Sequence, residues 1–206
     1  MKVTKEDNLK QKFLKKLDEK YNVYSQRKGV HITDLTYCLL QSFYRKTNPK
    51  PHNIRTLQFF VDGARRHEAL QELLGIESEV YVKKFGVVGS IDILLEFPVE
   101  IKTTRAQKNL PPHYFKQLGF YAVLCGVKEG YLIVQRINCK NNVPWEFYHI
   151  QWDNREIEDL ERELRDKANL FANALKLNNA NSLPKLDSSM QWKCRYCLYT
   201  KECSQG

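Results

Sequence analysis

Residues 86–104 read GVVGSIDILLEFPVEIKTT, and this stretch decides the fold. Valine, isoleucine and leucine, which favour strands, make up much of it, and a Phe-Pro pair interrupts it past the middle. We therefore expect two adjacent β-strands, over residues 86–97 and 99–104.

Three charged side chains stand out in these expected strands. Successive side chains of a strand point to opposite faces, so Glu100 and Lys102 would share a face while Ile101 points into the core. Asp92 lies between two isoleucines, and a carboxylate in such surroundings needs a cation or hydrogen bonds to stay charged. A pair of carboxylates beside a lysine suits a divalent cation and a phosphate under attack. The structural alternative is a hairpin end at Asp92 and an exposed Glu100–Lys102 pair.

The rest of the chain reads as helices and strands. Thr33 or Asp34 would cap a helix that carries Cys38 and ends before Asn48-Pro49. Other helices are expected over residues 4–20, 53–74, 111–125 and 156–177, with strands over 130–137 and 144–152. This order predicts an α/β domain whose mixed central sheet is flanked by helices. We expect one compact unit made of a helical region (1–48), a core (49–152) and a C-terminal part (153–206).

Composition narrows the class of protein. The chain has 206 residues, 42% of them hydrophobic, which is enough for one domain with a genuine core. Its net charge of +9 favours a polyanionic partner, because lysine and arginine contacts to phosphates release counterions. No run approaches the ~18 apolar residues that would span a membrane. The charged N-terminal segment does not resemble a signal peptide, so we expect a cytoplasmic protein with no membrane contact.

His67 is a candidate metal ligand on the 53–74 helix, with its side chain toward the sheet. A lone histidine there would be better explained as a hydrogen-bonded core residue. Beside Asp92 and Glu100, however, a neutral imidazole would complete a site of one nitrogen and two oxygen ligands, suited to manganese or magnesium. Gln117 and Tyr121 lie one turn apart on the 111–125 helix. They form either the solvent-exposed face of this helix or a polar stripe that faces the metal and contacts DNA.

Six cysteines occur in the chain, three of them within ten residues. Cys194 and Cys197 are separated by two residues, Cys203 follows, and Cys38 is the best candidate for a fourth ligand. From spacing alone, a structural zinc ion is favoured over an iron–sulfur cluster. A redox-active pair is disfavoured, because the motif does not open a helix after a strand. Two further cysteines are expected to be ordinary buried or half-buried residues: Cys125 and Cys139.

Four short motifs occur in the order and rough spacing of RecB-type nucleases, which belong to the PD-(D/E)xK superfamily. They are Gly63-x-x-x-His67, Gly89-x-x-Asp92, Glu100-x-Lys102 and Gln117-x-x-x-Tyr121. The chain departs from the pattern at Ile91, where a proline is common. The resemblance implies a restriction-endonuclease-like fold, with the nuclease core at residues 49–152.

The same resemblance implies roles for the motif residues. His67, Asp92, Glu100 and the backbone carbonyl of Ile101 would hold the metal. Lys102 would orient or activate the attacking water and stabilise the charge on the phosphate, and Gln117 and Tyr121 would contact the DNA.

One cysteine before these motifs and three after them is similar to the pattern of RecB-like nucleases with an iron–sulfur cluster. In a chain of about this length it resembles the fourth core CRISPR-associated (Cas) protein family, over residues 33–203. That resemblance reverses the preference for zinc. It implies a cluster, usually 4Fe–4S rather than 2Fe–2S, that closes a helical cap and is held by Cys38, Cys194, Cys197 and Cys203.

The family implies exonuclease activity on single-stranded DNA from the 5′ end, and it is also compatible with endonuclease activity. It further implies trimming of prespacer ends beside the integrase formed by the first and second Cas proteins, and it allows homo-oligomers. Two rival readings stay open. One is a non-catalytic DNA-binding or scaffold subunit, and the other is a RecB-like nuclease of general DNA repair.

Overall fold

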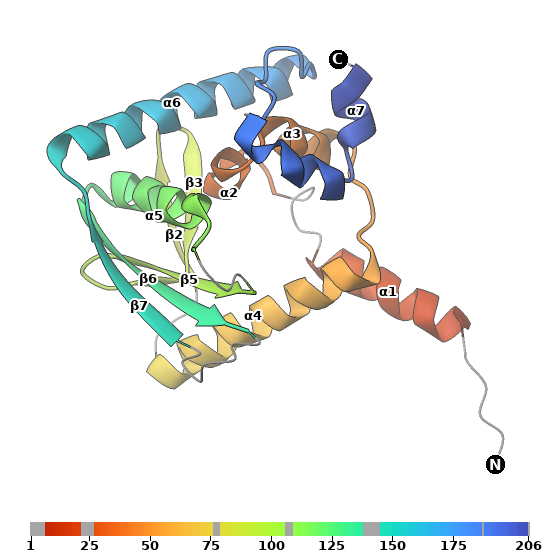
Figure 1. Cartoon of the computed structure of the whole chain (residues 1–206), viewed down its shortest axis with the longest axis horizontal. Coiled ribbons are helices and arrows are strands. Elements are labelled where there is room, and N and C mark those ends of the chain that lie inside the picture. The colour runs from red at the N-terminus through yellow and green to blue at the C-terminus, as the bar shows by residue number, and fades with distance from the viewer. Residues whose placement is uncertain are drawn as a thin grey trace.

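The computed structural model describes residues 7–21, 27–75, 79–105, 109–137, 145–186 and 188–205; Cys139 lies outside them. The helices, labelled in Figure 1, are α1 (Asp7–Tyr21), α2 (Ile32–Thr36), α3 (Leu39–Thr47), α4 (Ile54–Leu74), α5 (Pro112–Cys125), α6 (Asn154–Leu177), α7 (Thr200–Gln205) and the 3-10 helix η2 (Ser188–Tyr196). The strands are β1 (Val30–His31), β2 (Val80–Lys84), β3 (Val87–Ile91), β4 (Ile93–Leu94), β5 (Pro98–Thr104), β6 (Glu129–Arg136) and β7 (Trp145–Gln151).

The described strands form two sheets rather than the single central sheet expected. One sheet has the order β4-β5-β6-β7, in which β5 and β6 are parallel and the other pairs antiparallel. The second has the order β1-β3-β2, with β1 parallel and β2 antiparallel to β3. Parallel neighbours need a long crossover, and α5 supplies it between β5 and β6. The prediction of a mixed α/β fold is therefore confirmed, and that of one sheet is wrong.

The division between the sheets falls at Asp92, inside the stretch 86–97 that was expected to be one strand. β3 ends at Ile91, and the chain re-enters β structure at Ile93 in the other sheet. The Asp92 side chain accepts a hydrogen bond from the Ile101 N–H at 2.7 Å, and its carbonyl oxygen accepts one from the Gln71 side chain at 2.7 Å. These bonds satisfy the polar groups of the break, and they hold Asp92 beside the middle of β5.

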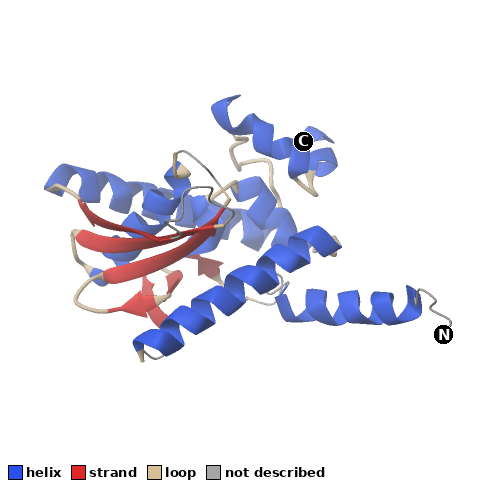
Figure 2. Cartoon of the chain, turned by 60° about the horizontal axis from the view of Figure 1, so that its bottom comes forward, coloured by secondary structure: helices blue, strands red, loops and turns tan. Residues whose placement is uncertain are grey.

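Helices cover both faces of the four-stranded sheet (Figure 2). On one face, Ile101 and Ile133 pack against Leu70 of α4. On the other, Leu118 of α5 packs against Leu132 of β6. Ile101 points into the core as expected, but Glu100 is equally buried, at 2% exposed. Both faces of β5 therefore lie inside the molecule, which places the charged residues of β5 in low-dielectric surroundings.

The helix expected around Cys38 is two helices. α2 ends at Thr36, Tyr37 has non-helical dihedrals (φ −110°, ψ −140°), and Cys38 is the N-cap of α3. Neither Thr33 nor Asp34 is a cap, because α2 already begins at Ile32. Asp34 instead accepts the His31 N–H at 2.9 Å. The break changes the chain direction and brings Cys38 to a helix start.

α4 and α5 match their expected bounds, and the glycines that follow them adopt left-handed conformations, as helix ends favour. The C-terminal segment of η2 and α7 lies beside α3 (Figure 1). Tyr199, buried at 2% exposed, stacks on Tyr44 with ring centroids 5.9 Å apart. Its hydroxyl accepts the Lys50 N–H at 3.2 Å. None of the helices in the described part of the chain is long and apolar enough to cross a membrane.

Candidate active site and cysteine site

β5 and α5 together position the first group of candidate residues. Glu100 and Lys102 project from the same face of β5 and form an ion pair. Gln117, which is buried on α5, bridges them: its amide nitrogen donates to Glu100 Oε1 at 2.8 Å, and its oxygen accepts from Lys102 Nζ at 3.0 Å. The same nitrogen lies 3.1 Å from the hydroxyl of Tyr121. The structure thus brings these four predicted residues together.

Glu100 carries an oxygen without a partner. Its Oε2 is buried and forms no hydrogen bond within the described residues. Burial raises the pKa of Glu100 from 4.5 to about 7; Lys102 opposes this shift and the nearby Asp92 carboxylate adds to it. A buried carboxylate oxygen without a donor is costly unless a cation neutralises it. The Glu100 side chain therefore fits a positively charged ligand on its Oε2 side.

Lys102 is held in its charged form. Burial alone would lower its pKa, but the nearby negative groups, with the Glu100 carboxylate first among them, together outweigh burial and raise it. Its ammonium lies 5.6 Å from the centre of the Tyr114 ring, a distance at which a cation is attracted to the aromatic face. Lys102 is accordingly suited to donate hydrogen bonds and to stabilise negative charge rather than to exchange a proton.

Asp92 and His67 complete the group from two other elements. His67 Nδ1 on α4 lies 3.4 Å from Asp92 Oδ1 at the break between β3 and β4. Burial would lower the pKa of His67, but the hydrogen bond and charge of Asp92 raise it overall. Oδ2 of Asp92 accepts the Ile101 N–H, so this one carboxylate links His67 to β5.

Six of the predicted site residues line one cavity of about 200 Å³: His67, Asp92, Glu100, Lys102, Gln117 and Tyr121. The sequence did not predict its other lining residues as site residues; among them are Arg27, His31, Thr33, Glu79 and Ser90. Thr33 Oγ1 is buried without a partner in the described part of the chain. The Arg27–Lys28 pair was recognisable only as a basic cluster, and nothing in the sequence connected it to Asp92.

As the side chains stand in the described residues, no three histidine, cysteine, aspartate or glutamate groups converge to hold a metal ion. The chemistry of the set nevertheless fits one. It combines an imidazole and two carboxylates, one of which has an unpaired buried oxygen, and manganese and magnesium accept such ligands.

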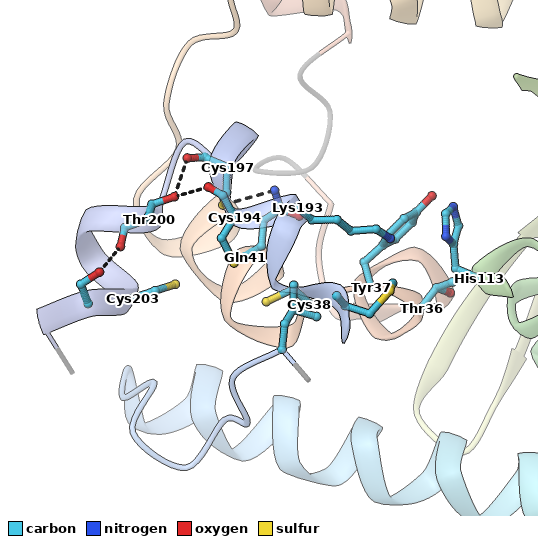
Figure 3. Close-up of a pocket in the computed structure, with 13 residues that line it drawn as sticks. Thr36, Tyr37, Cys38, Gln41, His113, Lys193, Cys194, Cys197, Thr200 and Cys203 are labelled. Atoms are coloured by element: carbon cyan, nitrogen blue, oxygen red, sulfur yellow. Dashed lines mark hydrogen bonds between the residues drawn. The ribbon is translucent and has the colours of Figure 1, made fainter. Parts of the chain in front are cut away.

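The cysteines form a second site. Cys38, Cys194, Cys197 and Cys203 line a cavity of about 230 Å³ between the α2–α3 break and the C-terminal segment (Figure 3). Its walls are mainly apolar, with Met190 and Leu186 among its lining residues. Tyr37 and His113 lie at its opposite end from Cys203 (Figure 3). Cys125 does not line this cavity, in agreement with its expected role as an ordinary half-buried residue.

Two N–H groups already point at one of these sulfurs. The Gln41 side chain donates to Cys197 Sγ at 3.5 Å, and the Tyr199 N–H donates to it at 3.4 Å. Burial, followed by the neighbouring thiols, raises the pKa of Cys203 to about 11, and burial raises that of Cys38. Such thiols stay protonated unless a cation takes the place of their protons. The donor set fits a thiolate-bound metal or cluster.

The aromatic residues around the cysteines divide by burial. Tyr199 is enclosed and anchors the C-terminal segment to α3, whereas Tyr196 is 81% exposed.

Comparison with known proteins supports the fold. No protein-family model and no curated protein matches the sequence. Among solved structures, SSO0001 superposes with a TM-score of 0.61 at 20% identity, over 94% of this chain and 95% of that one. An alkaline exonuclease, LHK-Exo from Laribacter hongkongensis, superposes with a TM-score of 0.50 at 11% identity, over 80% of this chain and 95% of that one. At these identities the likeness establishes a shared fold, and the mixed α/β architecture is compatible with the restriction-endonuclease-like fold that the motifs implied.

Proposed function

We propose that the chain is a metal-dependent DNA exonuclease that acts on single-stranded DNA from the 5′ end. One observation carries the proposal: Glu100, which has an unpaired buried oxygen, lines a cavity together with Asp92, His67 and Lys102. A site that only stabilised the fold would pair that oxygen, because an unmet buried acceptor costs about 1–3 kcal/mol.

In this proposal, His67, Asp92, Glu100 and the carbonyl of Ile101 hold manganese or magnesium. The bound ion supplies Lewis acidity and a lowered pKa for water. The Ile101 N–H is tied to Asp92, which fixes the peptide plane at this point of β5. The protein's own contribution is to fix two carboxylates and an imidazole from three elements around one point.

Lys102 acts as a charged group in this mechanism. Its raised pKa keeps the ammonium protonated, so it orients the water and stabilises negative charge that develops on the phosphate. Gln117 holds Lys102 and Glu100 at a fixed separation by bonding both. The Tyr121 hydroxyl accepts a hydrogen bond from Gln117 and extends this network along the wall of the cavity.

The choice of DNA as substrate rests on two supports. The net charge of +9 favours a polyanion, and LHK-Exo, which has the same fold, is named as an alkaline exonuclease.

For the cysteine site we propose an iron–sulfur cluster, 4Fe–4S in preference to 2Fe–2S. The support is the four-thiol cavity with N–H donors to Cys197, together with the family resemblance. Anaerobic purification followed by metal analysis tests it. A broad visible absorption band with stoichiometric iron is expected, and a colourless zinc protein would contradict the cluster.

The proposed cellular role is trimming of prespacer ends in CRISPR adaptation in the cytoplasm, beside the integrase of the first and second Cas proteins. It rests on the family resemblance. A trimming and integration assay with purified integrase tests it: prespacers with single-stranded ends should be shortened before integration only when the active chain is present. Equal integration of untrimmed ends would favour the general-repair alternative.

The activity itself is tested with single-stranded DNA labelled at either end, in the presence of manganese. The native chain should release short products first from the 5′ label. Binding without cleavage, unchanged by Glu100→Ala, would support the non-catalytic scaffold instead.

A further inference from the structure

A third cavity, of about 350 Å³, lies between α4 and the end of β5, next to the proposed nuclease site. Its lining residues include Phe59 and Gly63 of α4, Thr103 and Arg105 at the end of β5, and Tyr114 of α5. None of these five has a role in the cleavage chemistry described above. Gly63 belongs to the motif that identified His67, yet the catalytic cavity leaves it unexplained.

This cavity adjoins the reacting centre on two sides. Tyr114 lines the cavity, and the Lys102 ammonium lies 5.6 Å from the centre of the Tyr114 ring. On α4, Gly63 precedes His67 by one turn, which is about 6 Å along the helix axis. A nucleotide next to the scissile phosphate is therefore within reach of the cavity.

The cavity offers flat surfaces suited to a nucleobase. Phe59 is 38% exposed, and the guanidinium of Arg105 lies 4.3 Å from the centre of its ring. Arg55 approaches the same ring at 5.9 Å. Aromatic faces flanked by arginines stack bases of any sequence and attract the strand that carries them.

Two further features point to an occupant. A side chain on Gly63 would meet nothing within 4 Å, so glycine is not required there by packing. Glycine is a poor helix former, and its position in mid-helix leaves open the space beside Phe59. Thr103 Oγ1 is buried and has no hydrogen-bond partner in the described residues, so a polar atom of a ligand would satisfy it.

We propose that this cavity is a nucleoside subsite, which holds the base and sugar adjoining the scissile phosphate. The base stacks on Phe59 beside Arg105, Thr103 donates or accepts one hydrogen bond, and Gly63 provides the room. The subsite rests on the proposed nuclease function, and it adds the part of the substrate that the metal site does not contact.

The test uses single-stranded oligonucleotides that carry the fluorescent base 2-aminopurine at successive positions from the 5′ end. With the chain made inactive by Glu100→Gln, we expect fluorescence to be quenched at one position near the end. Phe59→Ala in that background should abolish the quenching. The control is Phe147→Ala, which removes a more exposed ring on β7 that does not line this cavity, and it should leave quenching unchanged.

Gly63→Leu in the active chain gives the second measurement. Leucine strengthens the helix, so the melting temperature should stay the same or rise, while KM for single-stranded DNA rises at least tenfold. An unchanged KM in a folded Gly63→Leu chain, with no position-specific quenching, would overturn the subsite alone, because cleavage itself continues. A native chain that neither binds nor cleaves the oligonucleotides would overturn the proposed nuclease function and the subsite with it.

Discussion

The carboxylate site and the cysteine site are built in opposite ways. Glu100, Lys102, Gln117 and Tyr121 belong to two packed elements and bond one another directly. The four cysteines, in contrast, come from the α2–α3 break and from short helices at the far end of the chain, and they surround a cavity. The first site is assembled by direct contacts among its own residues, whereas the second is a cavity that the proposed cluster would fill.

This difference separates two kinds of dependence. Protein contacts preorganise the carboxylate site, so its loss should affect the reaction more than the fold. The cysteine site joins distant segments, so its loss should affect stability more than the reaction.

The largest effect is expected for Glu100→Ala. Removal of a proposed metal ligand costs several kcal/mol of transition-state stabilisation, so the cleavage rate should fall by at least about 10³-fold. The measurement is single-turnover cleavage of labelled DNA with manganese. Glu129→Gln, which alters a carboxylate on β6 outside the cavity, serves as the control. Equal rates for both variants would show that Glu100 has no part in the reaction.

Gln117→Leu should slow cleavage by about 10- to 100-fold, as expected for a group that positions two others. It leaves two buried charged groups without their amide partner, which should lower the free energy of unfolding by about 1–3 kcal/mol. Urea unfolding and cleavage rates measure the two effects. Gln151→Leu removes an exposed glutamine and should change neither. A Gln117→Leu chain with native activity would break the view that this network preorganises the site.

Cys38→Ser and Cys203→Ser should each eliminate the visible absorption of the purified protein. We expect the melting temperature to fall by at least about 5 °C, because bound metal contributes directly to folding. Cleavage per folded molecule should fall by less than about tenfold. Cys125→Ser, outside the cavity, is the control. A Cys38→Ser chain that melts like the native protein but has lost cleavage would reverse the contrast between the sites.

The smallest effect concerns His113, near the end of the cysteine cavity. Burial, with smaller contributions from Lys193 and Lys102, lowers its pKa from 6.5 to about 4. Between pH 4 and pH 6.5, the folded and unfolded pKa values of His113, the unfolded chain binds more protons than the folded chain. The free energy of unfolding should therefore rise with pH across this window. His113→Asn should flatten the rise. Parallel pH dependences of urea unfolding for the native and variant chains would contradict this assignment.

The sequence predicted what is local, and missed what depends on distant packing. Helix ends at Gly75 and Gly126 and the strand through Glu100 follow from periodicity and turn residues, and the structure confirms them. The break at Tyr37 was not predicted, because nothing in the sequence near it opposes a helix. The break places Cys38 at a cavity that it shares with a segment over 150 residues away.

The candidate site was predictable to the same extent. Asp92, Glu100, Lys102 and Gln117 were recognised as a set through their order, and the structure brings them together. Arg27 and Thr33 could not be found in this way, because the pairing of β1 with β3, and not a motif, carries them into the cavity.

The cysteine site also sets an order of events in time. The hydrogen bond from Gln41 to Cys197 joins residues 156 positions apart in the sequence. At about 5–20 residues per second, translation takes about 8–30 s to cover that distance. During this interval Cys38 waits beside an already folding core with none of its partner thiols synthesised. The proposed cluster therefore cannot be completed until Cys194, Cys197 and Cys203 have been synthesised.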